Sequence, residues 1–354
     1  MQAGITILIC TYNGAARLPV TLQHIARQVI PLSLPCEVIV VDNASQDNSI
    51  DLAWREWRKY DAAISFKVIR EEQAGLTYAR EKGFAAAAYE YILLCDDDNW
   101  LSEAYVHTAF EVMQRHPSIG ILGGYGEFEF EATPPGWFNL FNLYAGGRQA
   151  AESGPVPGHL VYGAGAVLRK SAYKRLQEAG FVSLLTDRLG YQLSSGGDHE
   201  LCYALALAGY DVWYDDRLRF THFITANRLT PVYYRTYIKE SSRCFSVLEP
   251  YKILIKTGNN SLPQFRKELL KSFGYHARKM AFLMGNMAGS SNNKDRPMAQ
   301  RLELLMLRQR LLSYRYFKTM EKNFQLAATL KSRFSPLSSP TTQLEAFEQP
   351  VRQG

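Results

Sequence analysis

The 354-residue sequence is poor in cysteine, and the cysteines that it has are not spaced as metal ligands usually are. There are five, which is an odd number, and no two form a C-x-x-C pair: Cys10, Cys36, Cys95, Cys202 and Cys244. Close Cys pairs are typical of structural zinc sites, and even sets of Cys are typical of small secreted domains. We therefore expect reduced cysteines in the core of a cytoplasmic protein, without a structural zinc site.

The sequence also lacks the run of roughly 20 apolar residues that a membrane-spanning helix requires. Its first residues are not a basic segment followed by an apolar one, so no secretory signal is expected. With 47% hydrophobic and 21% charged residues, the composition excludes disordered, collagen-like and coiled-coil classes. The length is that of one large domain or two.

Negative and positive charges are concentrated in different parts of the chain. Through Phe223 there are 18 Lys and Arg against 26 Asp and Glu, a net charge of −8. From Ile224 onward there are 22 against 8, a net charge of +14. This asymmetry predicts an acidic domain over residues 1–225 and a basic helical extension over residues 226–354. The acidic part could hold metal ions, and the basic part could face an anionic surface.

The first part alternates short apolar runs with helical patterns. The apolar runs predict strands over residues 5–10, 37–42, 66–70 and 91–95. The helical patterns cover residues 49–60, 74–89 and 102–115. Strands that are apolar along their whole length are typical of a parallel sheet buried on both faces. We therefore predict an α/β fold, with a mostly parallel Rossmann-like sheet flanked by helices.

Polar side chains follow three of these strands, at the edge where open α/β sheets bind ligands. Thr11, Tyr12 and Asn13 follow the first strand, Asp42 ends the second, and an acidic triplet, residues 96–98, follows the fourth. Asp42 could accept a hydrogen bond from a nucleobase. Neither G-x-G-x-x-G after the first strand nor G-x-x-x-x-G-K-[ST] is present, so the dinucleotide fingerprint and the P-loop are excluded.

The acidic triplet is the candidate metal site. Asp96, Asp97 and Asp98 would repel one another, and a divalent cation would relieve that repulsion. Mg²⁺ and Mn²⁺ prefer oxygen ligands, often one or two carboxylates together with substrate phosphates. In the alternative interpretation Asp98 or Asn99 caps the next helix, which explains one polar residue but not three acids.

Four segments in order resemble the motifs of family 2 glycosyltransferases, whose GT-A fold binds nucleotide-sugars. They are I-L-I-C-T-Y-N at 7–13, V-V-D-N-A-S at 40–45, G-L-T-Y-A-R at 75–80 and L-C-D-D-D at 94–98. The resemblance covers about residues 5–225. It implies a nucleotide-sugar site made of Thr11, Tyr12, Asn13, Asp42, Arg80, Asp96 and Asp97.

The same resemblance implies a metal site and a catalytic base. Asp96 and Asp98 fall on the family's D-x-D motif, which holds ribose, diphosphate and Mn²⁺ or Mg²⁺. His222 stands where related enzymes often carry a metal-binding His, although a lone His between apolar residues is more often structural. Asp198 matches the catalytic base, at the start of a helix that we expect to end near Gly209; it could instead only cap that helix.

The acceptor side is expected to involve four further residues. Gly163 and Gly165 lie in a segment that resembles the family's G-A-G strand, and Glu200 is a second acid in the helix of Asp198. Trp137, in a loop that looks exposed, could stack on a sugar or could pack in the core. The family usually has Glu where this chain has Gly197, so the acidic neighbour of Asp198 is missing.

The basic extension shows helical patterns over residues 232–248, 262–288 and 297–320. Its third helix carries a cluster of cations: Arg301, Arg308, Arg310, Arg315 and Lys318. Such a helix could lie on the anionic inner face of the cell membrane, or it could be a solvated face or a contact between copies of the chain. Residues 289–293 are expected to form a loop and the last twenty residues a flexible tail. Nucleic acid is not expected as a partner, because the cations are dispersed along helices.

Together these features predict a metal-dependent, inverting glycosyltransferase. Its donor would be a nucleotide-diphospho-sugar, most simply a UDP-sugar, and its acceptor a hydroxyl of a surface polysaccharide or lipid-linked oligosaccharide. We expect it in the cytoplasm, with peripheral contact at the membrane. One alternative is a nucleotidyltransferase, although the loop after the first strand is poor in glycine. The other is a subunit that binds a nucleotide-sugar without catalysis.

Overall fold

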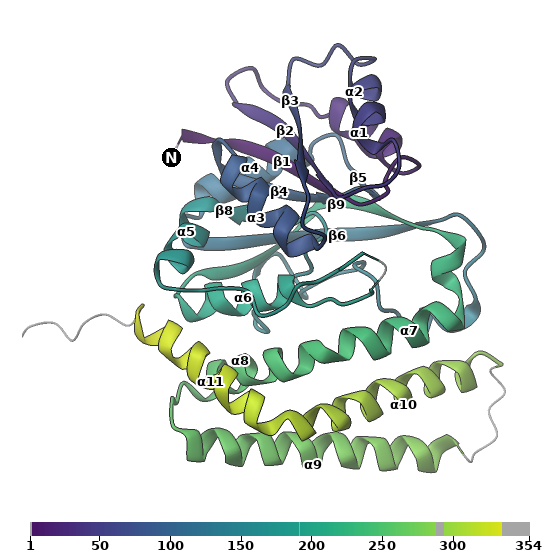
Figure 1. Cartoon of the computed structure of the whole chain (residues 1–354), viewed down its shortest axis with the longest axis vertical. Helices are drawn as coiled ribbons and strands as arrows, with labels where there is room; N and C mark the ends of the chain where they lie inside the picture. Colours follow the sequence, from purple (N-terminus) through teal and green to yellow (C-terminus); the bar gives the residue numbers. More distant parts are fainter. Residues whose placement is uncertain (1, 191, 288–293, 335–354) are drawn as a thin grey trace, which may run out of the picture.

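The four apolar runs form the parallel half of the central sheet. In the computed structural model, which describes residues 2–190, 192–287 and 294–334, they are β1 (Gln2–Thr11), β2 (Cys36–Asn43), β3 (Ser65–Glu71) and β4 (Tyr89–Asp96). These strands lie in the order β3-β2-β1-β4 and are parallel. Their connections contain α1 (Leu18–Ala26), α2 (Ser49–Trp57) and α3 (Leu76–Ala86). The predicted α/β unit is confirmed (Figure 1).

The other half of the sheet mixes parallel and antiparallel strands. It contains β5 (Asn99–Leu101), β6 (Ile119–Phe130), β7 (Gly154–Pro155), β8 (Val167–Arg169) and β9 (Asp211–Ile224). Strand β8 runs antiparallel to β4 and β6, whereas β6 and β9 are parallel to each other. The helices of this half are α4 (Tyr105–Arg115), α5 (Lys170–Glu178) and α6 (Gly197–Leu207). Strands β6 and β9 are only partly apolar, which is why the sequence patterns did not predict them.

Side chains of the parallel strands alternate between two hydrophobic clusters, one on each face of the sheet. Ile7 of β1 packs in the cluster that contains Leu18 of α1 and Tyr105 of α4. Leu8, the next residue, packs in the cluster that contains Ala79 of α3 and Leu201 of α6. Burial on both faces fixes the strands, so the polar residues at their carboxyl ends are held in place.

The C-terminal helices form a layer below the sheet (Figure 1). They are α7 (Pro231–Ser241), α8 (Phe245–Thr257), α9 (Leu262–Met287), α10 (Arg296–Ser313) and α11 (Phe317–Ser332). The cluster that contains Leu8 continues into this layer through Leu254, Phe265 and Phe324. One core therefore crosses the expected boundary at residues 225–226.

Two expectations for the extension need comment. The helix expected over residues 232–248 is divided by the 3₁₀ turn η3 (Ser242–Cys244). The expected loop at 289–293 and the expected flexible tail lie outside the described residues. None of the described helices has both the length and the apolar composition needed to cross a membrane.

Candidate active site

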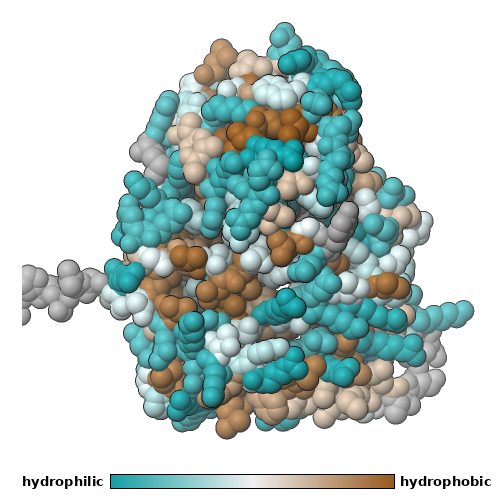
Figure 2. Space-filling view, in the orientation of Figure 1, coloured by the Kyte–Doolittle hydropathy of each residue, from teal (hydrophilic) through white to brown (hydrophobic). Residues whose placement is uncertain are grey.

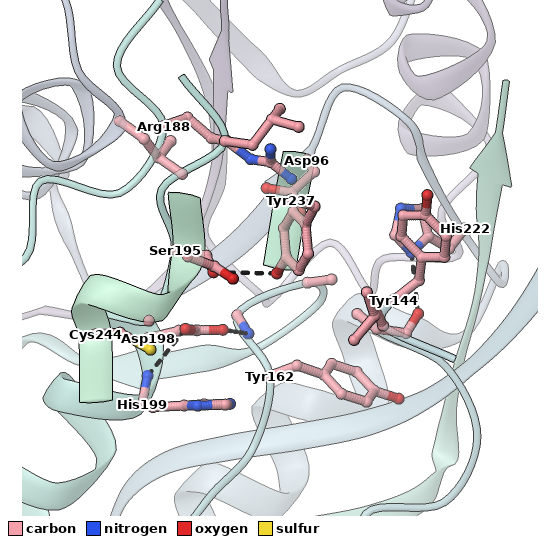
Figure 3. Close-up of a pocket in the computed structure, with 18 of the residues that line it drawn as sticks. Asp96, Tyr144, Tyr162, Arg188, Ser195, Asp198, His199, His222, Tyr237 and Cys244 are labelled. Carbon is pink, nitrogen blue, oxygen red and sulfur yellow. Dashed lines mark hydrogen bonds between the residues drawn. The ribbon is translucent and has the colours of Figure 1, made fainter. Parts of the chain in front are cut away.

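A cavity of about 1000 Å³ opens at the carboxyl ends of β1 and β4 and is closed on the other side by the C-terminal helices. Strand register brings the ends of the strands together: Cys10 is paired with Asp96 at the cavity, and Thr11 is paired with Asp42, which lies outside it. Ten of the residues singled out in the sequence line it: Thr11, Tyr12, Asn13, Arg80, Asp96, Asp97, Asp98, Gly163, Asp198 and His222. Figure 3 shows Asp96, Asp198 and His222 around the same space.

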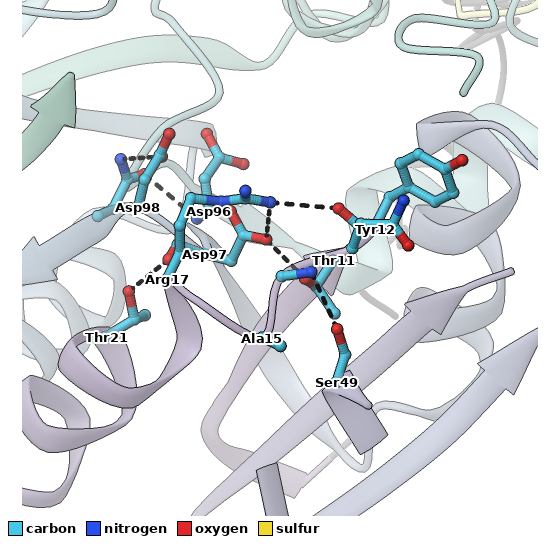
Figure 4. Close-up of polar contacts among 12 residues, drawn as sticks. Thr11, Tyr12, Ala15, Arg17, Thr21, Ser49, Asp96, Asp97 and Asp98 are labelled. Atoms are coloured by element: carbon cyan, nitrogen blue, oxygen red, sulfur yellow. Dashed lines mark hydrogen bonds and ion pairs between the residues drawn. The ribbon is translucent and has the colours of Figure 1, made fainter. Parts of the chain in front are cut away.

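The middle residue of the acidic triplet is held by neighbouring side chains (Figure 4). Arg17 donates through Nε to Asp97 Oδ1 and through Nη2 to Oδ2, both at 2.8 Å. Thr11 Oγ1 donates to Oδ2 at 2.5 Å, and Thr21 Oγ1 donates to the backbone carbonyl of Asp97 at 2.8 Å. Since both carboxylate oxygens are engaged, Asp97 joins β4 to β1 and α1. Asp97 also lines the cavity, and its direct contact with the nucleotide-sugar stays a prediction.

The two flanking acids differ in their partners. Among the described residues, no group donates a hydrogen bond to the Asp96 carboxylate, and burial with Asp98 beside it raises the pKa of Asp96 to about 6. Asp98 Oδ2 instead lies 2.7 Å from Arg228 Nη1 and 3.7 Å from His222 Nε2. Burial opposes ionisation of Asp98, but His222 and Arg228 lower the pKa of its carboxyl below the ordinary value. Asp98 is therefore a carboxylate whose charge is already compensated.

These residues do not form a preformed metal site of three ligands. Among the described residues, no group of three or more His, Cys, Asp or Glu could hold a metal ion. His222 Nδ1 lies 3.0 Å from the carbonyl of Ala145, and its Nε2 lies 3.5 Å from Arg228 Nη2. Mg²⁺ and Mn²⁺ are often bound by one or two carboxylates with phosphates and water. Asp96 and Asp98 fit that mode, provided that Arg228 releases Asp98.

Asp198 lies in the first turn of α6 and faces the cavity. Its Oδ2 accepts from the backbone N–H of Gly163 at 2.8 Å, and its Oδ1 accepts from that of His199 at 3.0 Å. Burial raises the pKa of Asp198, but His199, Arg80 and these two N–H groups lower it below the ordinary value. The carboxylate is therefore ionised at neutral pH, as a general base must be.

A residue that sequence reasoning missed explains the glycine before Asp198. Asp187 accepts from the backbone N–H of Gly197 at 2.7 Å and from Arg80 Nη1 at 3.1 Å. A Cβ on residue 197 would lie 2.5 Å from Asp187 Oδ2. The Asp187 carboxylate therefore occupies the space that the Cβ of a side chain at position 197 would need. The acidic group next to Asp198 is thus Asp187, from the loop before α6.

Three acceptor-side expectations are corrected. Trp137 is buried and packs edge-on against Tyr234, with ring centroids 4.7 Å apart, so the expected exposed aromatic is a core residue. Gly165 does not line the cavity: a Cβ there would lie 2.6 Å from the hydroxyl of Tyr105. Glu200 is fully buried and accepts from the backbone N–H groups of residues 184 and 185, so it anchors that loop.

Asp42 is a separate case. It is fully buried, it does not line the cavity, and its Oδ2 lies 3.7 Å from Arg70. Its Oδ1 is buried and has no hydrogen-bond partner among the described residues. A buried acceptor without a partner among the described residues, at the end of β2, is consistent with a hydrogen bond from an N–H group of a bound ligand. The nucleobase contact stays a prediction.

Further cavity residues come from segments to which the motifs gave no guide. Figure 3 shows Tyr144, Arg188 and Tyr237 around the cavity, together with Tyr162, which precedes Gly163 in the G-A-G segment. Among the described lining residues, six cations face four carboxylates; the cations are Arg17, Arg80, Arg188, Arg228, Lys252 and Arg310. Arg228 follows β9, a strand that the sequence patterns did not predict, so reasoning from strand ends did not reach it. Lys252 and Arg310 lie within helices of the extension, where no motif marked them.

Comparison with known proteins agrees with this geometry. Residues 6–177 match the model of glycosyl transferase family 2. The chain carries a family 2 glycosyltransferase domain. It is 30% identical to the putative glycosyltransferase EpsH of Bacillus subtilis over 125 residues, 35% of each protein. It is 28% identical to chondroitin synthase of Escherichia coli over 122 residues, 34% of this chain and 17% of that protein. The matches thus span about a third or less of these relatives.

Solved structures show the same fold at low sequence identity. The structure of S. aureus TarS 1–349 with UDP covers 94% of this chain and 92% of that chain, with a TM-score of 0.50 and 14% identity. The mannosyltransferase PcManGT of Pyrobaculum calidifontis, with GDP-Man and Mn²⁺, covers 94% and 88%, with a TM-score of 0.53 and 18% identity. The expected GT-A fold with C-terminal helices is confirmed.

Proposed function

We propose that this protein transfers a sugar from a nucleotide-diphospho-sugar to an acceptor hydroxyl. The observation that carries the proposal is one cavity in which the unpaired carboxylate of Asp96 and the ionised carboxylate of Asp198 face the same space. The cations that line the cavity suit a diphosphate group. Ligands of open α/β sheets bind at this edge.

Asp198 is the proposed general base. Each of its oxygens accepts one backbone N–H, which leaves lone pairs for the proton of an acceptor hydroxyl. As that proton moves to Asp198, the acceptor oxygen forms a bond to the anomeric carbon, and the bond from that carbon to the diphosphate breaks. A single displacement of this kind inverts the anomeric configuration.

Asp96 and Asp98 are the proposed metal ligands, with Mn²⁺ or Mg²⁺ as the cation. When bound, the cation would offset the charge that develops on the departing nucleoside diphosphate. The Mn²⁺ and GDP-Man in the structure of PcManGT support a divalent metal, and the UDP in that of TarS supports a UDP-sugar donor. Relatives named chondroitin synthase and poly-β-1,6-N-acetyl-D-glucosamine synthase support a polysaccharide or lipid-linked glycan as acceptor.

The test is a screen of UDP- and GDP-sugars with the purified protein, measured as release of nucleoside diphosphate with Mn²⁺, with Mg²⁺ and with EDTA. We expect release with one donor class, loss of it in EDTA, and loss of it in Asp98→Ala. Full activity in EDTA would overturn the metal assignment. Release of pyrophosphate from a nucleoside triphosphate supplied with a sugar phosphate would indicate a nucleotidyltransferase, and tight donor binding without turnover would indicate a binding subunit.

We also propose that the outer face of α9 contacts an anionic membrane surface in the cytoplasm. Helix α9 packs on α8, α10 and α11, and its other side exposes Leu270 (71%) and Phe282 (72%) close to Lys267 and Arg278. Apolar and basic residues on one helical face suit anionic lipid. Arg310 of α10, expected on such a face, is turned inward and pairs with Glu249.

Vesicle sedimentation tests this surface. Phe282→Glu should reduce binding to phosphatidylserine-containing vesicles at low salt, whereas Leu32→Glu, at a fully exposed site elsewhere, should not. In Figure 2, hydrophilic residues separate the apolar areas of the face that it shows, so non-specific hydrophobic binding to vesicles through that face is not expected. Equal binding of Phe282→Glu and the native protein would overturn the proposal. Self-association that Phe282→Glu abolishes would assign the face to a second copy of the chain.

A further inference from the structure

Arg228 occupies the acidic side of the cavity, in the 3₁₀ turn η2 (Ala226–Leu229) that follows β9. Its Nη1 donates to Asp98 Oδ2 at 2.7 Å, and its guanidinium lies over the ring of Tyr144, 4.8 Å from the centroid. The side chain is only 18% exposed, and its Nε is buried without a hydrogen-bond partner among the described residues. Arg228 is thus a buried cation with an unused donor beside a binding cavity.

The backbone of this turn is fixed, so a change in the position of the guanidinium would come from the side chain. Tyr144 donates from its hydroxyl to the carbonyl of Arg228 at 2.5 Å, and the Arg228 N–H donates to the carbonyl of Thr225 at 3.0 Å. Tyr144 and His222 lie together at one end of the cavity, with ring centroids 6.0 Å apart (Figure 3). Stacking on Tyr144 allows the planar guanidinium to turn while it keeps an aromatic partner.

A divalent cation that bound Asp98 Oδ2 would compete with Arg228 for that oxygen. Mg²⁺ binds carboxylate oxygen at about 2.1 Å. Arg228 Nη1 already lies 2.7 Å from Asp98 Oδ2, so both cations could not occupy this oxygen without strong repulsion. A bound nucleotide-sugar would offer Arg228 its phosphate oxygens as acceptors in place of Asp98. A guanidinium can bind such oxygens with two parallel N–H groups.

We propose that Arg228 is the resident cation of the diphosphate site. Arg228 neutralises Asp98 while the site is empty. When a divalent cation binds Asp98, Arg228 donates hydrogen bonds to the diphosphate of the nucleotide-sugar. This inference rests on the proposed function, since it assumes that the cavity binds a nucleoside diphosphate. It predicts that Arg228 weakens binding of the metal alone and strengthens binding of the metal together with the nucleotide.

Two binding titrations of the whole chain test the inference without any need for turnover. The first measures Mn²⁺ alone, and the second measures UDP in the presence of Mn²⁺, with GDP as a second probe. Arg228→Gln should bind Mn²⁺ alone more tightly than the native protein does. It should bind UDP with Mn²⁺ roughly tenfold or more weakly, the range of one lost charge-assisted hydrogen bond.

Two further variants keep the test decisive. Arg228→Lys keeps the charge but not the fork of donors, so its affinity for Mn²⁺ should stay near native while its affinity for UDP falls. Arg219→Gln, on β9 with a half-exposed ion pair to Glu127, should change neither titration. A thermal melt of each variant checks that it is folded.

The possible results distinguish failure of the role of Arg228 from failure of the proposed function. Binding of UDP and Mn²⁺ by the native protein together with unchanged titrations for Arg228→Gln would overturn the inference and leave the proposed function standing. Failure of the native protein to bind either UDP or GDP with Mn²⁺ would overturn both. Weaker binding of Mn²⁺ alone by Arg228→Gln would show that Arg228 assists the metal rather than competing with it, which also overturns the inference.

Discussion

Replacement of Asp198 by Asn separates a catalytic role from a structural one. The substitution keeps the size of the side chain and one carbonyl oxygen, but an amide cannot take a proton at neutral pH. In the native protein the carboxylate accepts from the N–H groups of Gly163 and His199. The Asn oxygen can keep the contact with Gly163, and its NH₂ group would then face the N–H of His199.

The structural cost of this change is therefore about one hydrogen bond to a charged group, roughly 1.5–3 kcal/mol of unfolding free energy. The catalytic cost is larger if Asp198 is the base. General-base catalysis typically contributes about 10²–10⁴-fold, which is about 3–5 kcal/mol of barrier. We expect Asp198→Asn to remain folded, to bind the nucleotide-sugar nearly as well as the native protein and to lose at least about a hundredfold in turnover.

The assay compares turnover, donor affinity and urea unfolding for the same preparation. Turnover within about threefold of native, which is less than ~1 kcal/mol of barrier, would refute the role of Asp198 as base. Glu200, the second acid of the same helix, would not replace Asp198 as base, because Glu200 is fully buried and holds the loop before α6. Asp187, which contacts Gly197 and Arg80, would be examined next.

Two further substitutions test the environment of the site. Burial raises the pKa of Glu200 to about 7, so between about pH 4.5 and 7 the folded state binds more protons than the unfolded state, and stability should fall as the pH rises through that window. Glu200→Gln should remove this loss, roughly 2–3 kcal/mol between pH 5 and pH 8 in urea unfolding; an unchanged pH dependence would contradict it. In Gly14→Ala the new Cβ would lie 1.9 Å from Thr11 Oγ1 and 2.6 Å from Asp97 Oδ2. We expect Gly14→Ala to be less stable than the native protein and to bind UDP more weakly. Native values of both would show that the loop after β1 rearranges to accommodate the new Cβ.

The parallel half of the fold could be predicted because its strands are apolar along their whole length. Ile7 and Leu8 are adjacent in β1 and both fully buried, which only a sheet covered on both faces explains. Strands β6 and β9 could not be predicted in this way, since each continues past the core as a partly exposed ribbon. Their pairing depends on contacts between distant residues, not on a local pattern.

The site shows the same division. Asp96, Asp98 and Asp198 could be predicted to share a cavity, because strand ends and helix starts meet at one edge of the sheet. Trp137 could not be assigned, since an aromatic after two prolines suits a loop or a core equally. The partner of Asp98 was also beyond the sequence: Arg228 lies 130 positions away, and only the pairing of β5 with β9 brings it there.

The C-terminal helices are part of the folded unit, and this predicts the result of removing them. A chain ending at Thr230 would lose Leu254, Phe265 and Phe324, which are at most 5% exposed and belong to the cluster that holds the sheet against α6. Each such side chain contributes roughly 1.5–3 kcal/mol when buried, and a whole domain is stable by only about 5–15 kcal/mol. The truncated chain should therefore fail to fold, although its sheet residues are all present.

A chain ending at Phe334 is the matched control, because it keeps every core residue of α7 to α11. It should unfold cooperatively in urea, with a near-ultraviolet circular dichroism spectrum like that of the full chain, whereas the chain ending at Thr230 should show neither property. A cooperative transition in the shorter chain would mean that the sheet is stable without the helices, and that they serve mainly as the wall that brings Lys252 and Arg310 to the cavity.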